Sequence, residues 1–241
     1  MFYEQLAKYY DVVFPSEPGK IAFLDREFKT RGAGRILDLA CGTGTYALEL
    51  ARLGYEAYGT DIEPQMVELA KEKAATHKVA VNFSVGDMRE PQSLGLTFDG
   101  LLCIGNSLAH LLDEGDLDKA LAAMRSVLRD KGVAVLQIVN FDRILSLGDT
   151  DLPLIERKGL RFLRTYRPQG SEKLVFDSVL EVTAENGVSQ RFKNSVELRP
   201  IRRADLEDAV HRAGFSAVKT FGDFKYGNYS HGSQALVMLA E

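Results

Sequence analysis

Short apolar runs alternate with amphipathic stretches through roughly the first 140 residues of the chain. The apolar runs predict five strands, at Arg35–Ala40, Glu56–Thr60, Val79–Val85, Phe98–Ile104 and Val133–Val139. The stretches between them predict helices at Thr45–Leu53, Pro64–Ala75 and Asp116–Arg129. Strands that alternate with helices in this way are typical of a parallel sheet with helices on both faces.

The pattern changes after Asn140, where apolar and polar residues alternate and predict antiparallel strands. These strands lie at Leu160–Tyr166, Leu174–Thr183 and Val188–Leu198, and Asn186-Gly187 predicts a type I′ hairpin turn between the last two. The remaining elements are a helix at Arg202–Ala213 and a final antiparallel pair, Phe215–Phe221 and Gln234–Ala240. We therefore expect an α/β fold, a doubly wound, Rossmann-like seven-stranded mixed sheet with a small antiparallel β insertion.

A single domain, 1–241, accounts for these elements, because 241 residues that are 45% hydrophobic can bury one sizeable core. Within it we expect an N-terminal helical lid at 1–31, a cofactor-binding core at 32–148, the antiparallel insertion at 149–200 and the C-terminal part of the sheet at 201–241. The insertion follows the fifth strand, near the strand ends where open α/β sheets bind ligands. It can serve there as a lid, as a pocket wall or as scaffold alone.

Charge and composition exclude several kinds of partner. The net charge of −4 disfavours nucleic acid, because phosphate-backbone binding depends on a dense positive surface. The four histidines lack the spacing of a metal site, so we assign no metal. We expect no membrane partner and a cytoplasmic monomer or homodimer, because the chain lacks a signal-peptide pattern and a bilayer-length apolar run.

The segment Ile36–Gly44 joins the first strand to a glycine turn and a helix. Gly42 and Gly44 let the backbone approach a ligand closely, and their N–H groups lie at the helix start. With Ala47 they also match the looser G-x-G-x-x-A dinucleotide pattern, which keeps a nicotinamide cofactor open. The segment therefore predicts a nucleotide-like cofactor.

Three acids narrow the choice of cofactor. Asp61 follows the second strand, where an acid can accept hydrogen bonds from both ribose hydroxyls of an adenosine group. Asp87, after the third strand, can accept from an adenine amino group while Met88 packs on the ring. Asp38, just before the glycine turn, would repel a pyrophosphate but suits a cation. The pattern favours a cofactor with sulfonium and ammonium groups.

These pieces resemble motif I, the ribose acid and the acid after the third strand of class I S-adenosylmethionine-dependent methyltransferases. The segments 104–111, 137–148 and 222–225 further resemble glycine N-methyltransferase and related small-molecule N-methyltransferases. The resemblance implies that the turn Ala40–Gly44 and Ile104 face the methionine part, that Asp61 binds the ribose, and that Tyr10 lies near the transferable methyl. The predicted cofactor contacts are Tyr10, Asp38, Ala40, Cys41, Gly42, Gly44, Asp61, Ile62, Met66, Asp87, Met88 and Ile104.

The chain departs from this family at the end of the fifth strand. Glycine N-methyltransferase has His-Arg-Asn there, and its Arg pairs with the carboxylate of glycine, whereas this chain has Ile138-Val139-Asn140. Because an apolar side chain cannot replace bidentate pairing by Arg, we do not expect glycine as the substrate. The basic residues of the insertion are either a solvated face or a replacement anchor, for which Arg199 is our candidate. The predicted substrate contacts are Asn106, His110, Asn140 and Arg199.

The sequence thus predicts an S-adenosyl-L-methionine-dependent methyltransferase, with S-adenosyl-L-homocysteine as product and a small-molecule acceptor that is preferably an amine. Tyr10 and His110 are the predicted catalytic residues, and His110 acts either as a general base or in packing the loop. Three alternatives stay open: a small-molecule O-methyltransferase, an NAD-dependent oxidoreductase and a non-catalytic S-adenosylmethionine-binding protein.

Overall fold

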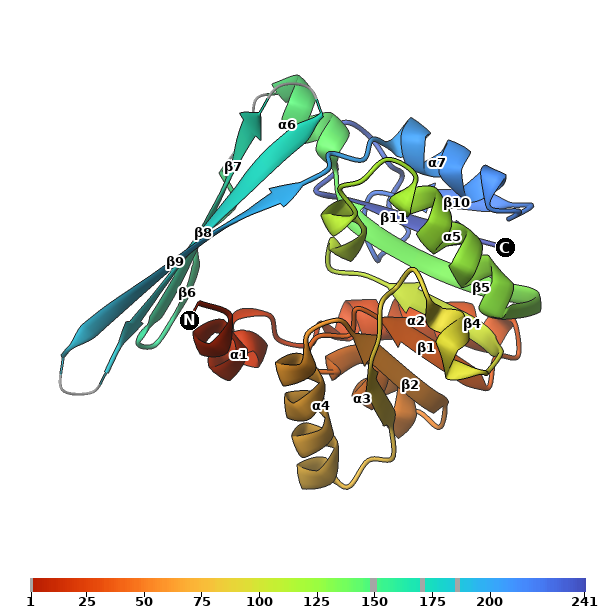
Figure 1. The fold of residues 1–241 in the computed structure, drawn as a ribbon, viewed down its shortest axis with the longest axis horizontal. Coiled ribbons are helices and arrows are strands. Elements are labelled where there is room, and N and C mark those ends of the chain that lie inside the picture. Colours follow the sequence, from red (N-terminus) through yellow and green to blue (C-terminus); the bar gives the residue numbers. More distant parts are fainter. Residues whose placement is uncertain (1, 148–150, 170–171, 185–186) are drawn as a thin grey trace.

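The computed structural model describes residues 2–147, 151–169, 172–184 and 187–241. Its main sheet has seven strands in the order β10-β11-β5-β4-β1-β2-β3 (Figure 1). The strands are β1 (Arg35–Leu39), β2 (Glu56–Asp61), β3 (Asn82–Val85), β4 (Phe98–Cys103), β5 (Leu128–Val139), β10 (Val218–Phe221) and β11 (Ala235–Ala240). The first five are parallel, and β11 pairs antiparallel with both β5 and β10. The predicted seven-stranded mixed sheet is confirmed.

Helices cover both faces of this sheet because its strands are apolar on both sides. On one face, α5 (Asp116–Val127) and α7 (Arg203–Arg212) pack over the central strands together with α6 (Phe141–Leu147). On the other, α2 (Pro18–Thr30) and α3 (Thr45–Arg52) pack over the same strands, while α3 and α4 (Pro64–His77) bury β2 and β3. Two short 3-10 turns, η1 (Pro91–Leu94) and η2 (Ser107–His110), precede and follow β4.

The strand order reverses between β1 and β4, and it is at such a switch point that doubly wound sheets bind ligands. Asp38 of β1 lies at this point, in register with Leu102 of β4 and Gly59 of β2. The fold thus brings the acid just before the glycine turn to the place where a crevice forms.

A second, antiparallel sheet follows α6 and projects away from the body of the molecule (Figure 1). Its strands, in the order β6-β7-β8-β9, are β6 (Ile155–Arg157), β7 (Leu160–Gln169), β8 (Lys173–Thr183) and β9 (Ser189–Leu198). This sheet confirms the predicted antiparallel β insertion, with β6 as an additional strand. The predicted Asn186-Gly187 turn includes Asn186, which lies outside the described residues.

The N-terminal helix α1 (Phe2–Val13) lies between the two sheets. Leu6 and Val13 pack with Leu160, Phe162 and Leu180 on the inner face of the antiparallel sheet. Toward the core, the Asp11 carboxylate pairs with Lys73 of α4 and accepts hydrogen bonds from the hydroxyls of Thr43 and Thr45. Since α2 is part of the helical layer on the main sheet, we propose that α1 alone forms the N-terminal cover.

Several predicted boundaries are wrong. The strand predicted from Val79 starts at Asn82, and the strand predicted from Phe215 starts at Val218. The sequence suggests a helix to Arg129 and a strand from Val133, whereas α5 ends at Val127 and β5 starts at Leu128. The pairing with β4 shifts register between Phe98 and Gly100, and Lys131 adopts a φ of 64°. A bulge therefore occupies the place where the sequence suggests a helix end.

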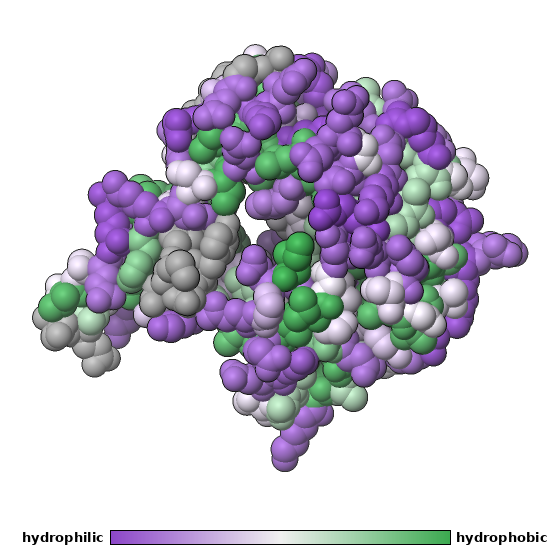
Figure 2. All heavy atoms as spheres, viewed as in Figure 1, coloured by the Kyte–Doolittle hydropathy of each residue, from purple (hydrophilic) through white to green (hydrophobic). Residues whose placement is uncertain are grey.

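The surface in the view of Figure 2 is mainly hydrophilic, and it is hollowed where the antiparallel sheet meets the body. None of the helices in the described part of the chain is long and apolar enough to cross a lipid bilayer.

Candidate active site

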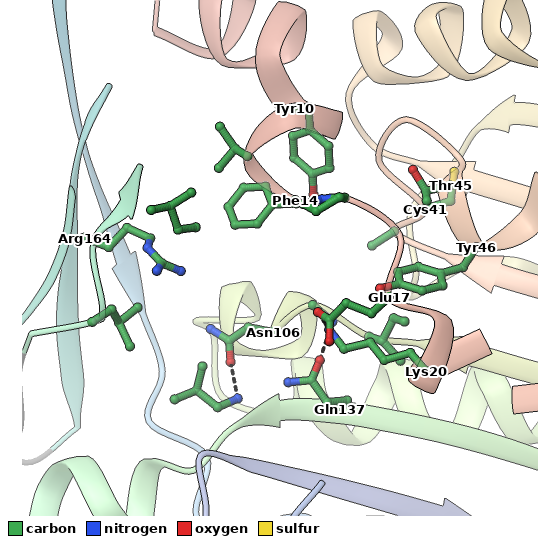
Figure 3. Close-up of a pocket in the computed structure, with 18 of the residues that line it drawn as sticks. Tyr10, Phe14, Glu17, Lys20, Cys41, Thr45, Tyr46, Asn106, Gln137 and Arg164 are labelled. Atoms are coloured by element: carbon green, nitrogen blue, oxygen red, sulfur yellow. Dashed lines mark hydrogen bonds and ion pairs between the residues drawn. The ribbon is translucent and has the colours of Figure 1, made fainter. Parts of the chain in front are cut away.

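A cavity of about 580 Å³ lies between the carboxyl ends of the central strands and the antiparallel sheet (Figure 3). One side is formed by the ends of β1, β4 and β5, and α1 with the loop that follows it forms another. The antiparallel sheet supplies the remaining wall. Seven predicted site residues line the cavity together, namely Tyr10, Asp38, Ala40, Cys41, Ile104, Asn106 and His110.

Asp38 is the buried acid of this cavity, with 2% of its surface exposed. Burial raises the pKa of its carboxyl to about 8, helped by the nearby Asp61 charge and opposed by a hydrogen bond from the Ala47 backbone. Its Oδ2 atom has no hydrogen-bond partner among the described residues. An unpartnered buried carboxylate oxygen is costly, and a cationic ligand group would relieve that cost.

Tyr10 reaches the glycine turn from α1. A Cβ placed on Gly42, whose φ is 54°, would lie 3.4 Å from the Tyr10 hydroxyl oxygen. Burial raises the pKa of Tyr10 to about 12, and the charges of Asp61, Asp11 and Asp38 act in the same direction. Tyr10 therefore stays a neutral hydroxyl that can donate or accept a hydrogen bond in the cavity.

Asn106 lies in the loop after β4, where its φ of 74° is left-handed. Its Oδ1 accepts a hydrogen bond from the backbone N–H of Val139 at 3.0 Å. The neighbouring Gly105 N–H donates to Oε1 of Gln137 at 2.8 Å. Both bonds fix this loop against the end of β5, and the amide group of Asn106 lies at the cavity (Figure 3).

His110 ends the η2 turn and lines the same cavity. Desolvation lowers the pKa of its imidazole, and the charge of Asp61 opposes that change. At neutral pH the ring is therefore uncharged, as a proton acceptor must be.

Asp61 does not line the cavity, and its carboxylate is occupied by the protein itself. Oδ2 accepts a hydrogen bond from the Gly42 N–H at 2.7 Å, and Oδ1 accepts one from the Glu63 N–H at 3.0 Å. Asp61 thereby ties the end of β2 to the glycine turn. A carboxylate oxygen has two lone pairs, so these bonds leave acceptor capacity for a ribose hydroxyl.

Asp87 is likewise engaged, by Arg89. Its carboxylate accepts from the Arg89 guanidinium at 2.6 Å and from the Arg89 backbone N–H at 2.8 Å, and this hydrogen bonding lowers its pKa. The side chain of Ile62, 61% exposed, follows Asp61, and Val85, 54% exposed, is the register partner of Asp61 on β3. These two exposed apolar side chains offer a surface on which an adenine ring can pack.

Three other predicted cofactor residues have packing roles in the structure. Gly44 caps α3 with a φ of 72°, and a Cβ there would lie 2.3 Å from the Phe83 ring. Met66 is buried on α4, and Met88 packs against the main core. Close packing is therefore sufficient to explain a glycine at position 44.

The structure places Asn140 and Arg199 outside the cavity lining. The Asn140 amide donates to the backbone carbonyls of Ser230 and Ser233, and its oxygen accepts from the Tyr229 hydroxyl at 2.7 Å. Asn140 is 1% exposed and fastens a distant loop to the end of β5. The backbone N–H of Arg199 donates to the Ala109 carbonyl at 2.8 Å, next to His110. We leave both residues out of the acceptor site proposed below.

Several residues that line the cavity were not predicted from the sequence. Gln137 and Glu17 lie on the body side of the cavity, and the antiparallel sheet contributes Arg164, Tyr166 and Phe176 (Figure 3). The rings of Tyr166 and Phe176 are 5.2 Å apart between centroids. The alternation of β7 and β8 shows that each strand has two faces, and only the folded arrangement shows which face meets the cavity.

Comparisons with known proteins show similarity to methyltransferases. Residues 36–132 match a methyltransferase domain. The chain is 28% identical over 204 residues to a glycine/sarcosine N-methyltransferase of Aphanothece halophytica, an alignment covering 84% of this chain and 74% of the relative.

Two solved structures share the fold. An S-adenosylmethionine-dependent methyltransferase from Clostridium acetobutylicum superposes with a TM-score of 0.85 at 17% identity, covering 99% of this chain and 98% of that one. A SAM-bound amino pentose methyltransferase from Micromonospora echinaspora superposes with a TM-score of 0.71 at 21% identity, covering 100% and 96%. The methyltransferase matches decide against the oxidoreductase and the non-catalytic alternatives. The methyltransferase domain match, the related N-methyltransferases and the shared sheet order together support a class I S-adenosylmethionine-dependent methyltransferase.

Proposed function

We propose that this enzyme transfers a methyl group from S-adenosyl-L-methionine to the nitrogen of a small-molecule amine inside the 580 Å³ cavity. The observation that carries the proposal is the buried Oδ2 atom of Asp38, which has no hydrogen-bond partner among the described residues and lies at the switch point, in a cavity that continues to the antiparallel sheet. The glycine/sarcosine N-methyltransferase and the amino pentose methyltransferase both act on amine-bearing small molecules, which supports this acceptor class.

The residues present fit S-adenosyl-L-methionine. Asp38 offers its free oxygen to the ammonium group, and the turn with Ala40, Cys41 and Gly42 offers backbone groups to the methionine part. Asp61 is placed to accept from the ribose, and the apolar side chain of Ile62 to pack on the adenine. When bound, the cofactor supplies a methyl group on a positively charged sulfur, which a neutral amine can take by in-line displacement.

The protein's own residues then have to align the acceptor and keep water out. Tyr10 brings a neutral hydroxyl to the edge of the glycine turn. Asn106 is held rigidly by Val139 and presents its amide N–H groups to the acceptor side. The uncharged ring of His110 can accept the proton that the acceptor nitrogen loses.

One observation also favours a second candidate, methyl transfer to a hydroxyl group. A hydroxyl is a weaker nucleophile than a neutral amine and needs a base, and His110 is an uncharged base in the cavity. His110→Gln separates the two: transfer to an amine that arrives neutral continues, whereas transfer to a hydroxyl stops.

A methyl-transfer screen tests the proposal. The protein is incubated with labelled S-adenosylmethionine and a panel of amines, amino sugars, amino acids and phenols, and products are identified by mass spectrometry. The expected product is a methylated amine. Labelled products confined to phenols would favour the hydroxyl candidate, and no product from any amine would refute the amine assignment.

A further inference from the structure

The inner face of the antiparallel sheet, which meets α1 and the cavity, carries one polar row between two apolar ones. The strand register places Arg164 beside Ser178 and Ser178 beside Asn194. The two flanking rows consist of Phe162, Leu180 and Phe192 on one side and of Tyr166, Phe176 and Val196 on the other. An inward position on a half-buried strand ordinarily carries an apolar side chain, so a charged residue there breaks the pattern.

The pairing of Arg164 differs from that of the other arginines of β7. Arg161 pairs with Glu156 and Glu181, and Arg167 pairs with Asp177; both arginines are exposed. Arg164 has no ion pair with a carboxylate in the described ranges; its Nη2 donates to the Pro153 carbonyl at 2.7 Å. Its Nε atom is buried without a hydrogen-bond partner among those residues.

Arg164 is partly buried, and its guanidinium lies 5.7 Å from the centroid of the Phe162 ring, but none of the described carboxylates pairs with it. Desolvation lowers the pKa of the Arg164 guanidinium, and the one nearby group that opposes it is the Tyr166 hydroxyl, not a carboxylate. A buried charge without a counter-ion is expensive, and an anionic ligand would offset that expense. Figure 3 shows the guanidinium pointing into the cavity, on the side opposite Cys41 and Tyr46.

The position of this charge also bears on the length of the acceptor. At the end of β5 the cavity is lined by the apolar Val139, and the cation on that side, Lys20, is ion-paired with Glu17 at 2.7 Å. Arg164 lies on the opposite wall, beside the aromatic pair Tyr166 and Phe176, and Arg157 of the same sheet also lines the cavity. An acceptor that reaches from the glycine turn to Arg164 passes along this apolar surface.

We propose that Arg164 recognises a carboxylate of the methyl acceptor, and that the acceptor is an amine whose carboxylate is separated from the nitrogen by an apolar carbon chain or ring. The inference rests on the proposed function and specifies its substrate class. Arg164 is the specificity-determining residue: its guanidinium holds the carboxylate, while the aromatic pair packs on the apolar part.

The experiment measures preference for an acid over its neutral amide. The probes are para-(aminomethyl)benzoate, gamma-aminobutyrate and glycine, each paired with its primary amide. Binding is measured by calorimetry on protein saturated with S-adenosyl-L-homocysteine, and kcat/KM is measured where transfer occurs. The variants are Arg164→Gln and Arg164→Lys, with the exposed Arg161→Gln on the same strand as matched control.

We expect the wild-type protein to prefer the two longer acids over their amides by roughly 10–100-fold, the range set by one charge-assisted pair. Arg164→Gln should reduce this preference to within about twofold, Arg164→Lys should retain part of it, and Arg161→Gln should match the wild type. S-adenosyl-L-homocysteine affinity should be the same in all four proteins, which also shows that the variants are folded.

Three results would overturn the inference: equal binding of each acid and its amide by the wild type, a preference that survives in Arg164→Gln, or no binding of any acid in the panel. Failure of the proposed function looks different. In that case the wild type binds no S-adenosyl-L-homocysteine, or it transfers no methyl group to any amine while the acid preference can still be measured by calorimetry.

Discussion

Asp38 gives cofactor binding a pH dependence that can be calculated. Binding the ammonium group of S-adenosylmethionine as an ion pair requires an ionised carboxylate and a protonated amine. The Asp38 carboxyl titrates at about 8 in the free protein, and an α-amino group ordinarily titrates near the same value. The product of the two populations is greatest close to pH 8 and falls about 20-fold by pH 6, because most Asp38 carboxyls are then protonated.

The perturbation is Asp38→Asn, which keeps the shape and removes the ionisable group. The variant should bind more weakly at pH 8, and its affinity should rise about twofold to threefold toward pH 6, because only the ligand amine still titrates. The assay is calorimetric Kd measurement from pH 6 to 9. Asp99→Asn, near the amino end of β4 and far from the switch point, is the control and should keep the wild-type profile.

The free energy of unfolding of the ligand-free protein should depend on pH in the opposite sense: it should decrease from pH 6 to 8, where cofactor affinity increases. The folded-state pKa of Asp38 lies above the unfolded value of 3.8, so the native protein holds a proton that the unfolded chain has released. The free energy of unfolding therefore falls as pH rises from about 4 to 8, by about 3.5 kcal/mol between pH 5 and 8, and Asp38→Asn should lack this loss. A wild-type Kd that is constant from pH 6 to 8, or an acid-side loss of affinity in Asp38→Asn, would refute the reasoning.

Three further substitutions test other parts of the site. Asp61→Ala removes two hydrogen bonds to backbone N–H groups and should weaken cofactor binding by roughly 1.5–3 kcal/mol; unchanged affinity by calorimetry would contradict the ribose assignment. Gly44→Ala forces a Cβ into the Phe83 ring and should lower the free energy of unfolding, measured in urea, by roughly 1–3 kcal/mol. Gly54 also has a positive φ but no atom within 4 Å of its Cβ position, so Gly54→Ala measures the backbone strain alone. His110→Gln should leave amine methylation near normal above pH 7, because an amine that arrives neutral needs no base for the transfer step; loss of amine turnover would make His110 essential.

The parallel half of the molecule could be predicted because its signals are local. Each strand and helix of that half is encoded by its own periodicity, and Asp38 and the glycine turn lie within nine consecutive residues of one motif. The switch point then follows from the topology that such a pattern favours.

The acceptor side could not be predicted, because its residues meet only after the antiparallel sheet folds over the cavity. Arg164, Arg167 and Arg199 look alike in the sequence, and their different environments depend on which face of the sheet turns inward. Asn140 is a similar case, because its hydrogen-bond partners Ser230 and Ser233 are about 90 residues away along the chain. Their carbonyls accept the amide N–H groups of Asn140 that a ligand would otherwise bind.

The position of α1 couples release of the cofactor product to occupancy of the acceptor site. The same helix carries Tyr10 at the glycine turn and packs Leu6 and Val13 against the inner face of the antiparallel sheet. A movement of α1 that lets S-adenosyl-L-homocysteine leave would therefore also expose the apolar side chains of the antiparallel sheet that α1 covers. Release of the cofactor product should then require an empty or loosened acceptor site, which makes the order of substrate binding and product release a property of one short helix.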